Sequence, residues 1–252
     1  MADAWIMKGL DRDDPRRIRS PRELTEAVKA LGFLPLFANE VPGFSAEERV
    51  CAHDWWTGDR ERDPWEWREV IAGAREVAYG KFFAGSAGFI SPEWLPVFAN
   101  ARRNGFDFDG KWQSGAASRR EKAIMEHFMD VESEDEPVFT GAAIRSTELK
   151  RMAGFGKGGE KNYAGVLTGL QMRLYLVIAG FRRRQNRRGE GYGMAVSVLA
   201  APESLWGYPL MTAAYDEAPC ASWDRIHRRL RELYPRAEEA DVVGLIGRRP
   251  EE

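Results

Sequence analysis

Five arginines within seven positions form the part of the chain best suited to binding a polyanion. They stand between two stretches rich in strand-forming residues, 174–178 and 192–198, which predict a β-hairpin with a basic tip. These arginines could neutralise the phosphates of double-stranded DNA or enter a minor groove. The alternative is a solvated, charged hairpin of an interaction domain. The five residues are Arg182, Arg183, Arg184, Arg187 and Arg188.

A glycine-rich turn, Gly154–Gly159, precedes this hairpin and separates two predicted helices. The first helix covers 146–153 and the second follows the turn, so the pair predicts a helix-turn-helix. Polar residues in the turn and at the start of the second helix could contact a phosphate backbone, and small or polar residues continue along the same helix face. The residues expected to bind DNA there are Lys157, Lys161 and Asn162, and the face continues through Gly165, Thr168 and Gly169.

Two patterns that resemble cofactor sites are incomplete. The glycines of the turn have the spacing of a phosphate-binding P-loop, but Glu160 stands where that motif requires a lysine. A carboxylate there would repel phosphates, so we expect no nucleotide cofactor. Cys51-Ala52-His53 has no second ligand pair at a suitable spacing, and we predict no metal and no other cofactor.

Asp63 and Glu66 are the candidate catalytic carboxylates, because they lie in a segment dense in tryptophan. An aromatic pocket there could hold a base flipped out of a duplex, and one of the carboxylates could assist its release. The alternative is that the tryptophans build a core and that Asp63 caps a helix beginning at Pro64. The tryptophans of this segment are Trp55, Trp56, Trp65 and Trp67.

The elements that must position these residues are mostly helical. Ser20–Glu23 and Ser118–Glu121 are capping boxes that predict helix starts, and Ser45–Glu48 repeats the signal. In the second half, the order helix, helix, helix, strand, basic loop, strand is that of a winged helix. We expect an α+β, mainly α, fold with a tandem winged-helix architecture, each unit combining a helix-turn-helix with a β-hairpin wing.

The chain divides into four predicted parts. They are a charged arm (1–19), a tryptophan-rich N-terminal helical or winged-helix domain (20–112), a basic winged-helix domain (113–208) and a C-terminal extension (209–252). The boundary between the two domains falls at an acidic linker that ends near residue 137. Within the extension, residues 222–233 predict an amphipathic helix packed against the rest of the molecule.

The charge of the chain is locally concentrated. Its 252 residues carry a formal net charge of −2, yet residues 141–191 hold eleven basic and three acidic residues, a net charge of +8. Such a concentration indicates a nucleic-acid-binding face. Two cysteines without a C-x-x-C pair indicate a reducing cytoplasm, and no apolar run has the length of a signal peptide or membrane span. The sequence favours no particular oligomeric state.

Two stretches resemble the AlkZ-like winged-helix DNA glycosylases of bacteria. Phe89–Phe98, followed by Arg102 and Arg103, is similar to a leucine-proline-acid-tryptophan-proline stretch of that family. The helix predicted over 160–171, the arginine hairpin and Ala201–Glu203 resemble a winged helix of the family and its exit. Proteins labelled as related to the family also carry signatures like Trp55–Gly58 and Asp63–Arg68. The resemblance implies a tandem winged-helix fold, double-stranded DNA as partner and glycosylase-like chemistry.

The chain departs from the family where the family's catalytic residues stand. A glutamine-apolar-glutamine or glutamine-apolar-aspartate motif follows the first helix of the family, whereas Phe33–Phe37 stands there in this chain and lacks both polar residues. The family's His-Glu-Ala stretch is replaced by Gly85–Ala87. The resemblance therefore assigns no catalytic residue here, and we expect Leu34, Leu36 and Phe37 to be buried in the core.

Three functions remain open at this point. The first is a DNA-binding protein related to DNA repair glycosylases, with a degenerate catalytic motif. The second is an active DNA glycosylase that excises alkylated or crosslinked bases, with Asp63 or Glu66 as its carboxylate. The third is a module that uses the winged helix for protein contacts without DNA.

Overall fold

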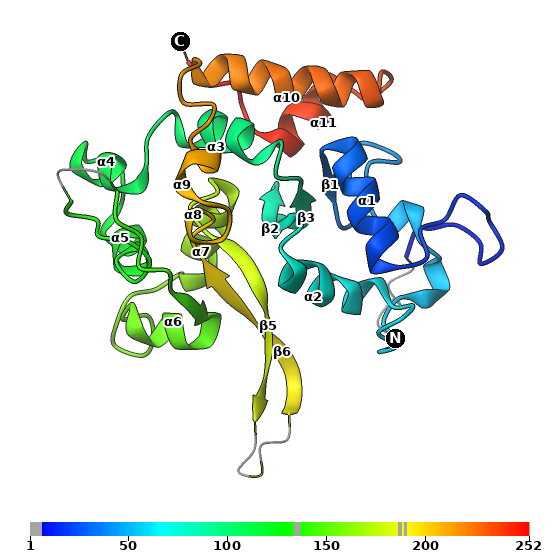
Figure 1. Cartoon of the computed structure of the whole chain (residues 1–252), viewed down its shortest axis with the longest axis horizontal. Coiled ribbons are helices and arrows are strands. Elements are labelled where there is room, and N and C mark those ends of the chain that lie inside the picture. Colours follow the sequence, from blue (N-terminus) through cyan, green and yellow to red (C-terminus); the bar gives the residue numbers. More distant parts are fainter. Residues whose placement is uncertain (1–6, 134–136, 186–187, 189–190, 252) are drawn as a thin grey trace.

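The fold is α+β and contains two small antiparallel sheets of three strands each (Figure 1), which confirms the expected fold class. The computed structural model describes residues 7–133, 137–185, 188 and 191–251. None of the helices in these ranges has both the length and the apolar composition needed to cross a membrane. The same ranges hold no group of three or more His, Cys, Asp or Glu side chains arranged to bind a metal ion.

The first sheet follows a helix that begins where the sequence predicts. The hydroxyl of Ser20 accepts a hydrogen bond from the Glu23 N–H, and Gly32, with φ 98°, ends the helix. The strand order is β1-β3-β2, and Ala84 and Gly85 form the tight turn between β2 and β3 with positive φ angles. The elements are α1 (Pro21–Leu31), β1 (Phe33–Pro35), α2 (Pro64–Ala74), β2 (Ala78–Phe83) and β3 (Ser86–Ile90).

The helix predicted at Ser45 is shorter than expected. Ser45 accepts a hydrogen bond from the Glu48 N–H at 3.2 Å, but the chain makes a single 3-10 turn, η1 (Glu47–Arg49), and becomes extended at Val50. A second 3-10 turn, η2 (Ala52–Asp54), follows. The helix stops because the backbone carbonyls of Arg49 and Val50 accept hydrogen bonds from the N-terminal arm instead of from a following turn.

The second sheet carries the longest strands of the described chain, and its hairpin projects away from the helices (Figure 1). The capping box at Ser118 is present, and the strand order is β4-β6-β5, the same as in the first sheet. β5 continues through Gln185, so Arg182, Arg183 and Arg184 lie in the strand and not in the connecting loop. The elements are α5 (Arg119–Met125), β4 (Ala143–Arg145), α6 (Ser146–Met152), α7 (Tyr163–Met172), β5 (Val177–Gln185) and β6 (Gly191–Ala200).

Two hydrophobic cores organise these elements. The first core contains most of the apolar residues before position 102 and also includes Met7 and Ile18 from the arm and Trp223, Ile226 and Leu230 from a C-terminal helix. That helix, α10 (Pro219–Leu233), packs on α3 (Leu95–Arg103) and confirms the predicted amphipathic helix. The second core lies between residues 108 and 201. The remaining helices are α4 (Phe108–Gln113), α8 (Glu203–Trp206), α9 (Tyr208–Met211) and α11 (Glu239–Ile246).

A buried arginine at the end of α3 ties the two cores together. Arg103 Nη1 lies 2.6 Å from Glu203 Oε1 on α8, and the two side chains are 1% and 2% exposed. The same Nη1 reaches Asp107 Oδ1 at 3.3 Å, and Nη2 donates to the carbonyl of Leu174, which follows α7. Burial alone would lower the pKa of Arg103, but the charge of Glu203 holds it above its usual value. Arg103 is therefore a charged anchor between segments 70 to 100 positions apart.

Replacing Arg103 with alanine should lower the free energy of unfolding by about 3–5 kcal/mol, because the carboxylate of Glu203 would stay buried without its partner. Urea denaturation of the two proteins measures this difference. Arg62→Ala is the matched control: it removes an exposed arginine paired with Asp59 and should cost less than about 1 kcal/mol. Equal losses in the two variants would contradict the anchoring role.

Candidate functional site

A cavity of about 680 Å³ lies between α2, the β2–β3 hairpin and the base of the β5–β6 hairpin. Walls from the first core and from the second sheet meet there, since Tyr79 of β2 and Phe181 of β5 are in ring contact at 6.0 Å between centroids. Met194 of β6, 86% exposed, also lines it. The volume suits one planar ring system with its substituents. We refer to this cavity as the pocket.

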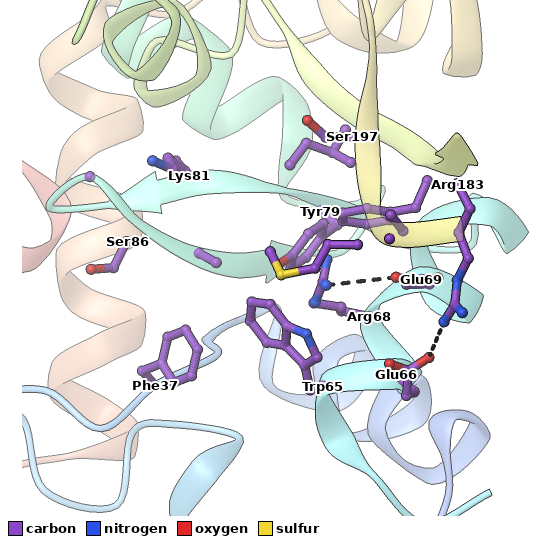
Figure 2. Close-up of a pocket in the computed structure, with 17 residues that line it drawn as sticks. Phe37, Trp65, Glu66, Arg68, Glu69, Tyr79, Lys81, Ser86, Arg183 and Ser197 are labelled. Atoms are coloured by element: carbon purple, nitrogen blue, oxygen red, sulfur yellow. Dashed lines mark ion pairs between the residues drawn. The ribbon is translucent and has the colours of Figure 1, made fainter. Parts of the chain in front are cut away.

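Four segments that the sequence analysis singled out separately meet in the pocket (Figure 2). Phe37 ends the apolar stretch Phe33–Phe37, and Ser86 belongs to Gly85–Ala87. Trp65 and Glu66 come from the tryptophan-rich segment, and Arg183 comes from the arginine hairpin. Nothing in the local sequence brings these positions together, because their meeting depends on how the two sheets are oriented.

Phe37 packs against the first core but is less buried than predicted. Leu34 and Leu36 are fully buried, as expected, but Phe37 is only partly buried and lines the pocket. β1 ends at Pro35, and the Leu36 N–H still donates to the carbonyl of Ala87 at 2.8 Å. Beyond that bond the chain leaves the sheet, so the ring of Phe37 turns to Trp65, with centroids 6.3 Å apart.

Arg68 occupies a flat slot in the wall of the pocket. Its guanidinium carbon lies 3.6 Å from the ring centroid of Trp65 and 4.2 Å from that of Phe181. The residue is 6% exposed, and its Nε has no hydrogen-bond partner among the described residues. Burial raises the pKa of Tyr79, next to it, to about 12, so its phenol is neutral at ordinary pH. The slot thus holds a planar cation between two aromatic faces.

Two carboxylates face this slot from one side of α2. Glu66 Oε2 lies 3.8 Å from Arg183 Nη2 and 3.9 Å from Arg60 Nε, and Glu69 Oε1 lies 3.7 Å from Arg68 Nη2 (Figure 2). These distances are ion pairs without hydrogen bonds. Glu66 Oε2 is buried and has no hydrogen-bond partner within the described ranges. Its charge is balanced by Arg183 and Arg60, while its hydrogen-bonding capacity is unused among the described residues.

Asp63 has a different position. Its Oδ1 accepts from the Trp65 N–H at 2.9 Å and its Oδ2 from the Gly58 N–H at 2.8 Å, so it caps α2, which begins at Pro64. It does not line the pocket. Of the two carboxylates singled out in the sequence, Glu66 is the one in the pocket.

Sequence reasoning gave no functional role to several pocket residues, among them Glu69, Tyr79 and Lys81. Arg68 was noticed only as the end of the Asp63–Arg68 signature. One signal was present: Glu66 and Glu69 are three positions apart, which places them on the same face of the helix that Pro64 begins. The alternation of side chains in a strand places Tyr79 and Lys81 on the same face of the sheet. It does not show that the β5–β6 hairpin covers this face.

The residues expected to bind DNA lie on the surface where the structure describes them. Lys157, Lys161, Asn162, Arg182, Arg183 and Arg188 are exposed. Arg184 is in β5, although its side chain is outside the described residues, as are Arg187 and most of the connecting loop. The predicted exposure of the Arg182–Arg188 segment is therefore described at Arg182, Arg183 and Arg188.

The face of α7 is less free than the sequence suggested. Gln171 Oε1 accepts from the Lys81 N–H at 3.2 Å, and Thr168 Oγ1 lies 3.5 Å from Lys81 Nζ. Thr168 and Gly169 are partly buried, and Thr168 lies against the β2–β3 hairpin, so this end of the face is more covered than its beginning. The first turn of α7 remains exposed, including Lys161 and Asn162 just before it.

The glycine turn before α7 encloses a second hollow, of about 460 Å³. Three cationic side chains line it: Lys150, Arg151 and Lys157. Within the described chain, the N–H groups of 156–158 donate to no backbone carbonyl. Glu160, the acid at the lysine position of a P-loop, points into an ion pair with Arg120, at 2.7 Å between Oε2 and Nε. Cations and free N–H groups together suit an anion such as a phosphate group.

The comparisons with known proteins give one match. The model of a family described as AlkZ related matches residues 18–247 of the chain. No curated protein and no solved structure matches the chain.

The glycine turn generates a testable contrast between two glycines. The Glu160 N–H donates to the carbonyl of Gly154 at 3.0 Å, and a Cβ on Gly159 would lie 2.2 Å from that carbonyl oxygen. Gly159→Ala should therefore open the turn and lower the free energy of unfolding by about 1 kcal/mol or more. Amide hydrogen exchange at Glu160 should become faster.

The control is Gly156→Ala, because a Cβ on Gly156 has no atom within 4 Å. It should change the free energy of unfolding by less than about 0.5 kcal/mol. A Gly159→Ala protein with the stability and exchange rate of the Gly156→Ala protein would show that the turn does not depend on this close approach.

Proposed function

The chain belongs to the AlkZ-related family, and on that premise we propose that it is a protein that binds double-stranded DNA and is related to DNA repair glycosylases. The positions that match the family's catalytic motif carry apolar residues, Phe33–Phe37, so the proposal includes a degenerate motif. The free, buried cysteines Cys51 and Cys220 fit the expected cytoplasmic setting.

We propose a tandem winged-helix architecture from the shared topology of the two sheets. In each sheet the first strand pairs with the third, and the third pairs with the second. In the second unit (113–208), α6 and α7 stand between the first two strands, and the long β5–β6 hairpin is the wing. The first unit (20–112) has α2 in the corresponding place and the shorter β2–β3 hairpin as its wing. The arm (1–19) and the extension (209–252) then complete the first unit.

One observation carries the DNA-binding proposal. Arg183 belongs to the cationic hairpin and also lines the pocket beside Glu66. The phosphate-binding side chains and the pocket are therefore parts of one surface. A duplex held by the hairpin would have a base near the mouth of the pocket, whose wall combines the rings of Trp65 and Phe181 with the Arg68 guanidinium between them and would receive a base turned out of the helix.

The salt dependence of duplex binding, compared before and after removal of hairpin arginines, tests this proposal. The fourfold change Arg183→Ala, Arg184→Ala, Arg187→Ala and Arg188→Ala should weaken duplex binding about equally for all sequences, because phosphate contacts carry no base information. The slope of log affinity against log salt should fall in magnitude by about 0.9 per lost contact, or roughly 3 in total. Fluorescence anisotropy with a labelled duplex at several salt concentrations measures both quantities.

The matched control removes four arginines from the C-terminal part of the molecule, which lies at the end opposite the hairpin (Figure 1). Arg225, Arg228, Arg236 and Arg248 are exposed there. Their replacement by alanine changes the net charge equally and should leave the salt slope almost unchanged. An unchanged slope in the hairpin variant would remove the hairpin from the interface. Absence of duplex binding by the wild type at low salt would leave the protein-contact module as the function.

The second candidate function is an active DNA glycosylase, and the observation that favours it is that Glu66 lines the pocket with an oxygen, Oε2, that accepts no hydrogen bond among the described residues. Hydrolysis of an N-glycosidic bond adds water at the sugar carbon while the base leaves with the bonding electron pair and a proton. A carboxylate at the site can take the proton of the attacking water or stabilise the cationic sugar. Glu66 Oε2, buried in the pocket, is in place for either role, whereas Asp63 is committed to capping α2.

Base release from methylated DNA distinguishes the second candidate from the first. If Glu66 acts as the general base, Glu66→Gln should reduce the rate at which DNA bases are released by about 10²–10⁴-fold. The affinity for duplex DNA should stay within a few-fold of wild type. Glu76→Gln, an exposed carboxyl paired with Lys29, is the control and should release bases at the wild-type rate. No release of bases by the wild type would exclude the second candidate and leave the first.

A further inference from the structure

A cluster of four aromatic rings connects the pocket with the molecular surface. Phe37 and Trp65 line the pocket with centroids 6.3 Å apart, and Trp56 lies 4.6 Å from Trp65. Trp55 lies 5.7 Å from both Phe37 and Trp56 and is buried, so the four rings form a closed group. Trp56 is its exposed member, at 52%. We call these four residues the aromatic cluster.

The backbone holds Trp56 in an unusual conformation. Its φ is 63°, a left-handed value that a bulky side chain rarely adopts and that glycine or asparagine accepts without strain. The residue follows η2 and its C-cap Trp55, in a position that often carries glycine at the end of a helix. Strain of this kind concentrates at binding sites, where the surrounding structure maintains it. An exposed tryptophan kept in a strained backbone needs a reason other than core packing.

Two cationic side chains lie near the aromatic cluster, each ion-paired with neighbouring carboxylates. Arg12 Nη2 lies 3.0 Å from Asp54 Oδ1, two residues before Trp56, and Arg12 is itself mostly exposed. Arg60 follows Trp56 by four residues, is also mostly exposed, and reaches Glu66 and Glu69 of the pocket at 3.9 Å. A ligand that offers flat rings joined by phosphates would find both kinds of partner here.

We propose that Trp56 is a stacking platform for an unpaired base next to the base that enters the pocket, so that the protein prefers DNA containing a short unpaired segment. This inference rests on the proposed DNA-binding function. An unpaired strand can leave one base in the pocket and lay its neighbour on the exposed ring of Trp56, which contacts Trp65 of the pocket wall. A base in a continuous duplex is already stacked on both sides and cannot use this platform. The sequence of the unpaired bases matters little, because every base has a flat face.

The test compares two labelled DNA molecules of equal length, a fully paired duplex and the same duplex with a short internal unpaired segment. The wild type should bind the second more tightly. Trp56→Ala should weaken binding to the DNA with the unpaired segment by about tenfold, within the range found for loss of one base-stacking contact, and leave binding to the paired duplex unchanged. Trp56→Phe should restore most of the preference, because phenylalanine keeps a flat ring. Val70→Ala, an exposed apolar residue on α2, is the matched control and should behave as the wild type.

Each other outcome overturns the inference. Equal affinity of the wild type for the two DNA molecules, or an undiminished preference in Trp56→Ala, removes the platform and leaves the proposed duplex binding standing. Absence of binding to either DNA removes both proposals. If Trp56→Ala binds DNA as the wild type does and instead changes the oligomeric state in light scattering, Trp56 is a protein contact. Thermal unfolding of each variant verifies that a loss of binding is not a loss of folding.

Discussion

The buried ion pair between Arg103 and Glu203 sets the geometry on which the rest of the molecule depends. Its two side chains come from the end of α3 and from α8, and Arg103 also holds the carbonyl that follows α7. Arg102, the next residue back, donates to the carbonyl of Met172 at the end of α7 and lies over the ring of Phe98. These contacts fix the second sheet against the first core, so the two arginines that resemble a family motif act here as structural anchors.

The pocket is a consequence of that fixed orientation. α2 and β2 provide one wall and the base of the β5–β6 hairpin provides the other, so a small rotation between the sheets would separate Trp65 from Phe181. The same orientation places the positive charge of the hairpin beside the acids of α2. A chain that is nearly neutral overall thereby presents a local alternation of charge, with arginines outward and two carboxylates in the pocket.

Local signals predicted the elements well, and long-range contacts decided the site. Side-chain caps at Ser20, Asp63 and Ser118 fixed helix starts, and alternation predicted the hairpin, because these features depend on neighbours within a few positions. The capping signal at Ser45 leads to only one 3-10 turn, because the carbonyls that a longer helix would use accept hydrogen bonds from N–H groups of the arm. Phe37 was assigned to the core from its composition, and only the meeting of β1, α2 and the hairpin shows it in the pocket. The stacked position of Arg68 could likewise not be predicted, because its two aromatic partners, Trp65 and Phe181, are separated by more than a hundred positions.

The most direct measurement of the central claim is hydrogen–deuterium exchange of the whole chain with and without a saturating duplex at low salt. The account predicts slower exchange in the glycine turn, the first turn of α7, the β5–β6 hairpin and the start of α2, with α10 and α11 unchanged. Protection confined to α10 and α11, or no protection anywhere under conditions where the duplex is bound, would contradict the claim that the hairpin and the pocket form the DNA-binding face.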